Sequence, residues 1–131
     1  MSKPNEDLEN RVRIIVIAGD RELVKRYSEL FGAQATIHSI TTPPQYGSGL
    51  DETMRRFKPD LIVTELQISG STIDEFEGFT AIKYYHTHFP KIPIVCCSYF
   101  VSADSKEGSR IRKETLRFGA IDALPKVPMP N

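Results

Sequence analysis

Polar side chains stand at the ends of short apolar runs in this sequence. Glu65 and Ser98 close two such runs, and Lys126 comes soon after a third. If these runs are neighbouring parallel strands, a carboxylate, a hydroxyl and an ammonium group meet at one edge of the sheet. A glutamate is ionised at neutral pH. The three groups can therefore form a charge-assisted, hydrogen-bonded cluster.

The apolar runs are rich in Val and Ile and nearly continuous, which is typical of strands buried on both faces of a parallel sheet. We expect strands at residues 12–18, 35–40, 60–66, 92–98 and 121–124. The segments between them have helical spacing. An alternation of strands and helices predicts a parallel sheet with right-handed crossovers and helices on both faces.

Helix ends are indicated by capping residues. Asp20 and Gly32 bound a first helix, and Ser48 caps a second helix that carries Leu50, Met54 and Phe57 on one face. Asp51, three residues after Ser48, adds a capping-box signal. Two further helices are predicted at residues 79–88 and 105–118, the second closed by Gly119.

Composition narrows the function. The 131 residues suit one domain, which we place at residues 12–131 after a flexible tail at residues 1–11. Seventeen cationic and seventeen anionic side chains give no net charge, so this domain is not expected to bind nucleic acid. The sequence has no membrane span and no secretion signal, and the adjacent Cys96 and Cys97 suit reduced thiols. We expect a cytoplasmic protein.

In order and spacing, these segments resemble the receiver domain of response regulators in two-component signalling. The resemblance rests on Arg13-Ile-Ile-Val-Ile-Ala-Gly-Asp20, Lys58-Pro-Asp-Leu-Ile-Val-Thr-Glu65, Glu77-Gly78, Ile92-Pro-Ile-Val-Cys-Cys-Ser98 and Gly119-Ala-Ile-Asp-Ala-Leu-Pro-Lys126. It implies a flavodoxin-like, doubly wound α/β fold with a five-stranded parallel sheet in the order 2-1-3-4-5. It also implies that Ser98 and Lys126 are retained pocket residues.

The departures from the family pattern concern phosphotransfer. In the family, two acids after the first strand hold Mg²⁺ together with an aspartate that accepts the phosphoryl group. Here the acidic pair falls on Ala18 and Gly19, and the acceptor falls on Glu65. Only Asp20, displaced by one position, remains as an acid. We expect weak or absent Mg²⁺ binding, no metal site, no other cofactor and no catalytic residue.

Two interpretations of Glu65 remain open. In the first, its permanent charge imitates phosphorylation together with Ser98 and Lys126. In the second, the pocket has decayed and Glu65 only pairs with Lys126. The family's aromatic switch position falls on Ala123, which removes the usual relay and favours the second interpretation.

Two regions distinguish the chain from an ordinary receiver. Residues 67–77 form a loop that is longer than in the family and overhangs the pocket; its acids Asp74, Glu75 and Glu77 are interpreted as solvated. After Lys126, five residues with two prolines cannot form the family's fifth helix, which is therefore missing or truncated. We expect a homodimer contact or a partner helix over the uncovered sheet face, or a longer parent chain.

The sequence thus predicts an atypical receiver that binds a protein partner in a signalling pathway without phosphorylation, and that is not an enzyme. One alternative is a Mg²⁺-dependent, phospho-accepting response regulator. Another is a receiver-like module that senses a small molecule in the pocket beside Glu65.

Overall fold

The computed structural model describes residues 11–41, 44, 46–68, 77–102 and 104–125. Within them lie five strands: β1 (Val12–Ile17), β2 (Ala35–Ile40), β3 (Leu61–Thr64), β4 (Ile94–Ser98) and β5 (Asp122–Pro125). Four α-helices connect them: α2 (Arg21–Phe31), α3 (Ser48–Phe57), α4 (Glu77–His88) and α5 (Lys106–Phe118). A short 3₁₀ turn, η1 (Gly32–Gln34), follows α2.

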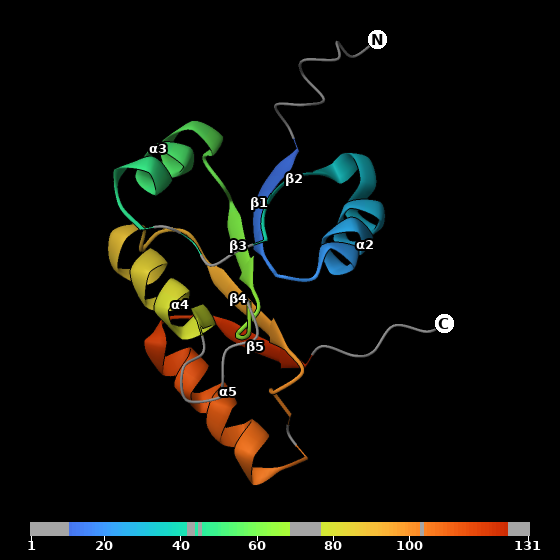
Figure 1. Cartoon of the computed structure of the whole chain (residues 1–131), viewed down its shortest axis with the longest axis vertical. Helices are drawn as coiled ribbons and strands as arrows, with labels where there is room; N and C mark the ends of the chain where they lie inside the picture. Colours follow the sequence, from blue (N-terminus) through green and yellow to red (C-terminus); the bar gives the residue numbers. More distant parts are fainter. Residues whose placement is uncertain (1–10, 42–43, 45, 69–76, 103, 126–131) are drawn as a thin grey trace.

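The strands form one parallel sheet in the order β2-β1-β3-β4-β5, as predicted. Figure 1 shows α2 on one side of this sheet and α3, α4 and α5 on the other. The strand order reverses between β1 and β3. The connection that follows β1 lies on one face of the sheet, and the connection that follows β3 lies on the other. A doubly wound sheet places its pockets at this reversal, beyond the carboxyl ends of the strands.

The centre of the sheet is apolar on both faces. In β1, Ile15 and Ile17 join the larger core under α3, α4 and α5, whereas Ile14 and Val16 join a smaller core under α2. All four are at most 2% exposed. Burial on both faces explains why this strand is a continuous apolar run rather than an alternating one.

Most predicted helix ends are confirmed. The Asp20 carboxylate accepts hydrogen bonds from the backbone N–H groups of Glu22 and Leu23 at 3.0 and 3.3 Å. Gly32 and Gly119 close α2 and α5 with positive φ angles of 53° and 128°, where a side chain would be strained. The Ser105 hydroxyl caps α5 by accepting from the Gly108 N–H at 2.9 Å.

Two predicted helix starts are wrong. Gly47, not Ser48, is the N-cap of α3; its φ of 129° suits glycine, and no side chain caps this end. Asp51 therefore forms no capping box. Helix α4 begins at Glu77, two residues before the start predicted from helical spacing and at the Glu77-Gly78 pair of the family resemblance; Gly78 is buried against the backbone of Glu65 and Leu66.

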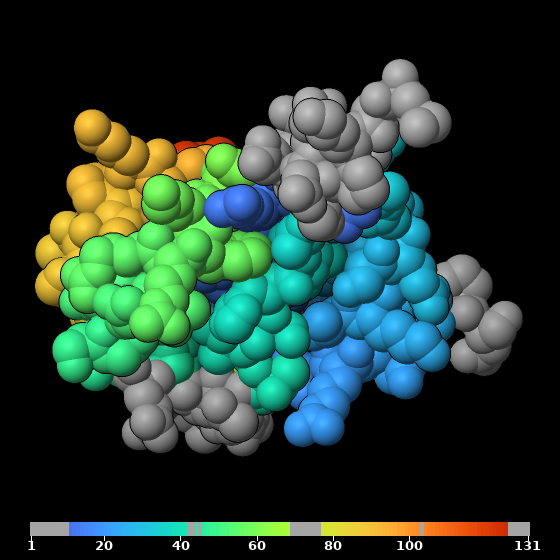
Figure 2. Space-filling model, turned by 90° about the horizontal axis from the view of Figure 1, so that it is seen from above, coloured from blue at the N-terminus to red at the C-terminus, as the bar shows by residue number. Residues whose placement is uncertain are grey.

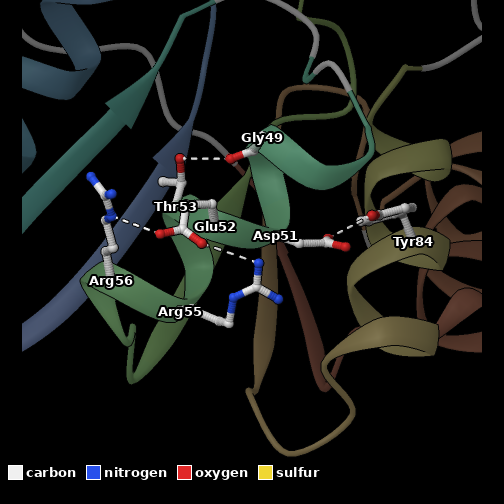
Figure 3. A network of polar contacts seen from close by, with 7 residues as sticks. All are labelled: Gly49, Asp51, Glu52, Thr53, Arg55, Arg56 and Tyr84. Carbon is white, nitrogen blue, oxygen red and sulfur yellow. Dashed lines mark hydrogen bonds and ion pairs between the residues drawn. The ribbon is translucent and has the colours of Figure 1, made fainter.

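Asp51 instead links two helices. Its carboxylate accepts a hydrogen bond of 2.7 Å from the Tyr84 hydroxyl of α4 (Figure 3). On the same helix, Glu52 pairs with Arg55 and Arg56 at 3.1 and 2.8 Å. These contacts hold the pKa of the Glu52 carboxyl below its usual value. Asp51 and Glu52 of α3 are therefore engaged, the first by α4 and the second by arginines of the same helix.

The described residues cover the sheet face beside α2 only in part. Helix α2 has no buried residue, whereas each of α3, α4 and α5 has at least two. The parallel register places Val63, Val95 and Asp122 in one row beside Val16, and Cys97 beside Leu124. Val63, Val95 and Cys97 are half-buried, and Leu124 is 46% exposed.

We call the part of this face that the described residues leave uncovered, at Val95 and Leu124, the open sheet face, because Val63 packs against the smaller core and Cys97 lies beside Tyr27 of α2. Figure 2 views the molecule from above, with α3 in green on one side of the start of β1 and α2 in light blue on the other.

None of the helices in the described ranges is long and apolar enough to cross a membrane.

Three predictions fall outside the described residues. They concern the tail at residues 1–10, most of the overhanging loop, including Asp74 and Glu75, and the segment 126–131 with Lys126 and the missing fifth helix.

Candidate functional site

Glu65 lies where the sequence places it, directly after β3 and at the carboxyl edge of the sheet. Its backbone N–H donates to the Ile17 carbonyl at 2.9 Å, which extends the β1–β3 pairing by one step. Its own carbonyl accepts from the buried Thr64 hydroxyl at 2.9 Å. The Glu65 side chain is half-buried. Hydrogen bonds at both its N–H and its carbonyl therefore fix the Glu65 backbone from which the carboxylate extends.

The first turn of α4 packs against the backbone of Glu65 and Leu66. A Cβ atom on residue 78 would overlap the backbone of Glu65 and Leu66, so only glycine permits this approach. The Gly78 N–H donates to the Leu66 carbonyl at 2.9 Å. Leu66 itself is fully buried in the larger core. Helix α4 is thus tied to the strand end that carries Glu65.

Ala18 and Gly19, which the sequence places at the acidic-pair positions, lie next to the chain that follows β3. Ala18 is 1% exposed, and its N–H donates to the Ile40 carbonyl at 2.9 Å. A Cβ atom on residue 19 would overlap the backbone carbonyl of Ile68. The Ile68 side chain is 5% exposed and belongs to the larger core. The space that an acidic side chain at residue 19 would enter is therefore filled by protein.

This packing refines the predicted overhang. The described beginning of the loop does not stand away from the sheet edge, because Ile68 is anchored in the core and its backbone carbonyl lies where a Cβ atom on Gly19 would be. The sequence signal for this arrangement is present but small. Leu66 and Ile68 alternate with Glu65 and Gln67, so two apolar side chains point to the core beyond the end of β3.

The remaining acid of this edge, Asp20, serves as the N-cap of α2. It is exposed, and one of its oxygens accepts both capping hydrogen bonds. A carboxylate at a helix N-terminus is favoured there by the helix dipole. The chain thus uses its displaced acid to begin a helix.

Ser98 ends β4 as predicted and is 3% exposed. Its hydroxyl accepts from the Phe100 N–H at 3.1 Å, and its carbonyl accepts from the Val101 N–H at 3.3 Å. These bonds hold the turn that leads to α5. Ala123, which the sequence places at the switch position, is 2% exposed and pairs with Cys96 in the sheet. A methyl group in the core has no rotamer change to transmit.

The donor set does not fit Mg²⁺. This cation takes oxygen ligands in near-octahedral geometry and is usually held by one or two carboxylates. Positions 18 and 19 supply no side-chain oxygen, and Asp20 is engaged as a cap. Within the described ranges, no group of three or more His, Cys, Asp or Glu residues is placed to hold a metal ion.

Tyr27 is a site residue that the sequence did not reveal. From α2 its side chain lies beside Cys97 of β4. Burial, the interaction with Cys97 and the negative charge of Glu65 raise the pKa of Tyr27 above its ordinary value. Burial, followed by the charges of Cys97 and Glu65, raises the pKa of the Cys96 thiol. Both groups therefore stay neutral beside Glu65.

Comparison with known proteins found no matching family model. Among curated proteins, the chain is 26% identical over 115 residues to the protein-glutamate methylesterase/protein-glutamine glutaminase of group 1 operon from Pseudomonas putida. It is 24% identical over 116 residues to the corresponding protein of Lawsonia intracellularis. Each match covers 88% of this chain but only 28% and 29% of the relatives. The chain thus spans less than a third of their length.

Solved structures show the same fold. The BeF3-activated receiver domain of DrrB, a Thermotoga maritima response regulator, superposes with a TM-score of 0.66 at 14% identity, covering 92% of this chain and 87% of that one. The signal receiver domain of the response regulator NarL from Mycobacterium tuberculosis gives a TM-score of 0.61 at 16% identity over the same shares. With its parallel sheet, strand order and Glu65 at the strand end, the chain has the receiver-domain fold of response regulators.

Proposed function

We propose that this chain is a pseudo-receiver: a regulatory module that binds protein partners in two-component-type signalling without being phosphorylated. The observation that carries the proposal is the contact between Gly19 and the Ile68 carbonyl. An acid at residue 19 would overlap that carbonyl. The metal-binding half of the phosphotransfer site is therefore replaced by packed backbone.

The acceptor position supports the same proposal. Phosphoryl transfer depends on the position of the nucleophile and on neutralisation of the transferred charge by a metal ion. Glutamate carries its carboxylate one methylene further from the backbone than aspartate does. A displacement of about 1 Å can cost about 100-fold in rate. Glu65, fixed at its backbone and without acidic metal ligands beside it, is a poor phosphoryl acceptor.

Loss of function in the pocket is favoured over permanent activation. A state held on by Glu65 needs a relay from the pocket to a partner surface. Ala123 is a buried methyl group at the position where the family has an aromatic switch. Ser98 is engaged in its own turn through both of its oxygens. The pocket therefore has a structural role in joining β3, β4 and α4.

The open sheet face is the proposed partner contact. Among the described residues, Val95 remains half-buried and Leu124 remains 46% exposed although both belong to a parallel sheet. Such sheets are normally covered on both faces. An apolar helix or a second copy of this chain would complete the layer beside α2. The exposed apolar surface gives this contact its driving force.

Incubation of the chain with Mg²⁺ and acetyl phosphate, or with Mg²⁺ and beryllofluoride, tests the proposal. The DrrB receiver domain, which forms a BeF3-activated state, is the positive control. We expect no phosphorylated species by intact-mass analysis and no shift of the Glu65 amide signal by NMR. A mass increase of one phosphoryl group on this chain would establish a phospho-accepting response regulator instead.

Sedimentation velocity tests the partner contact in its homodimer form. If two copies join through the open face, Leu124→Glu should shift the equilibrium to monomer. Ile121→Glu is the matched control, because Ile121 is 66% exposed and lies just before β5, three residues from Leu124. A monomer at all concentrations would leave a different protein as the partner.

A further inference from the structure

Helix α5 carries a line of cationic side chains on its outer side. Lys106, Arg110, Lys113 and Arg117 are spaced by four, three and four residues, which places them along one face of the helix. The buried residues of the same helix, Gly108, Ile111 and Thr115, lie on the opposite face. The cationic line is therefore directed away from the core.

A groove runs beside the first half of this line. It has a volume of about 480 Å³ and is lined by Asp104, Ser105, Lys106, Ser109, Arg110 and Lys113. We call these six residues the α5 groove. Its lining thus contains three cationic side chains, two hydroxyl groups and one carboxylate. Every cation and hydroxyl in it can donate a hydrogen bond to an acidic ligand.

The two lysines of the groove are available for an external partner. Arg110 pairs with Glu107 of its own helix, and this ion pair holds the pKa of the Glu107 carboxyl below its usual value. Arg117 pairs with Glu114 at 3.5 Å. Neither Lys106 nor Lys113 forms an ion pair with any carboxylate of the described residues. The positive charge of the groove is thus only partly neutralised from within.

This charge is local. Helix α5 contains five cationic and two anionic side chains, whereas the rest of the chain has twelve cationic and fifteen anionic ones. The remaining surface therefore repels an acidic ligand while the α5 groove attracts it. Such an asymmetry directs a partner to one place on the surface.

Helix α5, which carries the groove, is held in place at both ends. A Cβ atom on Gly108 would come within 2.7 Å of the backbone and side chain of Ser102, so the start of α5 fits closely against that turn. The C-terminal end is fixed to α4 by an edge-to-face contact between Phe79 and Phe118, with ring centroids 5.1 Å apart. A preformed site loses less entropy on binding than a flexible one.

We propose that the α5 groove binds an acidic, extended protein segment whose carboxylates occupy alternate positions. Alternate residues of an extended chain face the same side about 7 Å apart. Along the helix, Lys106 and Arg110 are separated by about 6 Å, and Lys106 and Lys113 by about 10.5 Å. A segment with two or three such acids meets these cations in turn. This inference rests on the proposal that the chain acts by binding.

Other ligands fit the groove less well. Single-stranded nucleic acid is held by aromatic rings that stack on bases, and no aromatic residue lines the groove. A single phosphate ion would contact one end only, because the two free lysines lie about two helical turns apart. Several separate carboxylates on one chain match this spacing.

An NMR titration of the ¹⁵N-labelled chain tests the assignment, with the peptide Glu-Ser-Glu-Ser-Glu as the probe and Gln-Ser-Gln-Ser-Gln as its neutral control. We expect saturable shifts of the amide signals of Ser105, Lys106, Ser109, Arg110 and Lys113 with the acidic peptide alone. The double variant Lys106→Glu and Lys113→Glu should weaken binding at least about ten-fold. The variant Lys25→Glu and Lys91→Glu has the same net charge and should bind as the natural chain does.

Equal weakening in both double variants would overturn the assignment, because it would show attraction by net charge and not by the groove. Shifts scattered over the whole surface, or the same shifts with inorganic phosphate or an oligothymidylate, would also overturn it. Phosphorylation is measured at Glu65 by mass, so failure of the groove assignment and failure of the proposed function are distinguished.

Discussion

The backbone carbonyl of Ile68 occupies the position that a Cβ atom on Gly19 would need. This contact joins the chain after β3 to the turn after β1, and it depends on the absence of any side chain at residue 19. Anchoring of the Ile68 side chain in the core keeps the carbonyl in place. The absence of an acid at residue 19 is thus part of the packing of this edge.

Gly19→Ala should destabilise the chain. The added methyl group meets backbone, which cannot rotate away, so the turn must shift and part of the Ile68 burial is lost. Overpacking of this kind costs about 1–3 kcal/mol. Urea unfolding followed by circular dichroism measures the change in the free energy of unfolding.

Gly49→Ala is the matched control. Gly49 lies in the first turn of α3, and a Cβ atom there would meet nothing within 4 Å. Alanine is favoured over glycine in helices by up to about 1 kcal/mol, so this variant should be as stable as the natural chain or more stable. Equal losses in the two variants would mean that the Gly19–Ile68 contact is not responsible.

Glu65→Asp should not create a phospho-acceptor. The substitution restores the nucleophile expected of a receiver but leaves Ala18 and Gly19 without carboxylates and Asp20 engaged as a helix cap. Without a bound metal ion to neutralise the developing charge, phosphoryl transfer stays slow. Intact-mass analysis after incubation with Mg²⁺ and acetyl phosphate should show no modified protein. Phosphorylation of this variant would mean that Glu65 alone prevents the reaction.

Much of the fold could be predicted from the sequence because its signals are local. The Val- and Ile-rich runs located the strands, and Asp20, Gly32 and Gly119 marked helix ends through their own hydrogen bonds or φ angles. The prediction that Ser48 caps α3 is wrong, because the preceding residue, Gly47, has the positive φ and is the N-cap. Capping preferences of side chains do not anticipate such a backbone choice.

The site was predictable only in part. The positions of Glu65 and Ser98 follow from the strand ends, and the consequences of Ala18 and Gly19 follow from their lack of oxygens. The burial of Ile68 and the reach of Tyr27 to Cys97 did not follow, since both depend on packing between segments far apart in the sequence. A single isoleucine in a polar loop is too weak a sequence signal to predict that its side chain is buried in the core.

Tyr85→Phe should raise the stability of the chain. Tyr85 is fully buried in α4, and its hydroxyl has no hydrogen-bond partner among the described residues. A buried polar group without a partner costs about 1–3 kcal/mol, so its removal should stabilise by about 1 kcal/mol. Thermal and urea unfolding provide the measurement.

The neighbouring Tyr84→Phe is the contrasting control. Its hydroxyl donates to the Asp51 carboxylate across the α3–α4 contact (Figure 3), so phenylalanine should lower stability. Two Tyr-to-Phe substitutions side by side in one helix should thus act in opposite directions. A loss at Tyr85 as large as that at Tyr84 would show that the Tyr85 hydroxyl is satisfied.

Stability should fall as the solution becomes alkaline. Burial raises the pKa of Cys96, Tyr27 and Tyr85 and raises that of Tyr46 to about 12. In the unfolded chain these groups release protons near their ordinary values of 9.0 for cysteine and 10.0 for tyrosine. A group with a raised pKa in the folded state contributes stability that is complete below the unfolded pKa and is lost as pH rises toward the folded pKa. The free energy of unfolding should therefore be nearly constant at pH 7–8 and decline from about pH 9 upward.

Urea midpoints measured from pH 7 to pH 11 follow this decline, and Cys96→Ala separates its first part. Cys96 is fully buried and has the lowest ordinary pKa of these groups, so its removal should flatten the curve between about pH 9 and pH 10 while tyrosines govern the steeper fall above. The variant is less stable at every pH because a buried side chain is shortened. The ionisation of the thiol is therefore read from the slope of the midpoint against pH and not from the midpoint itself. A natural chain whose midpoint is unchanged at pH 11 would mean that these groups ionise as readily in the folded protein as in the unfolded one, and that the surroundings of Glu65 are open to water.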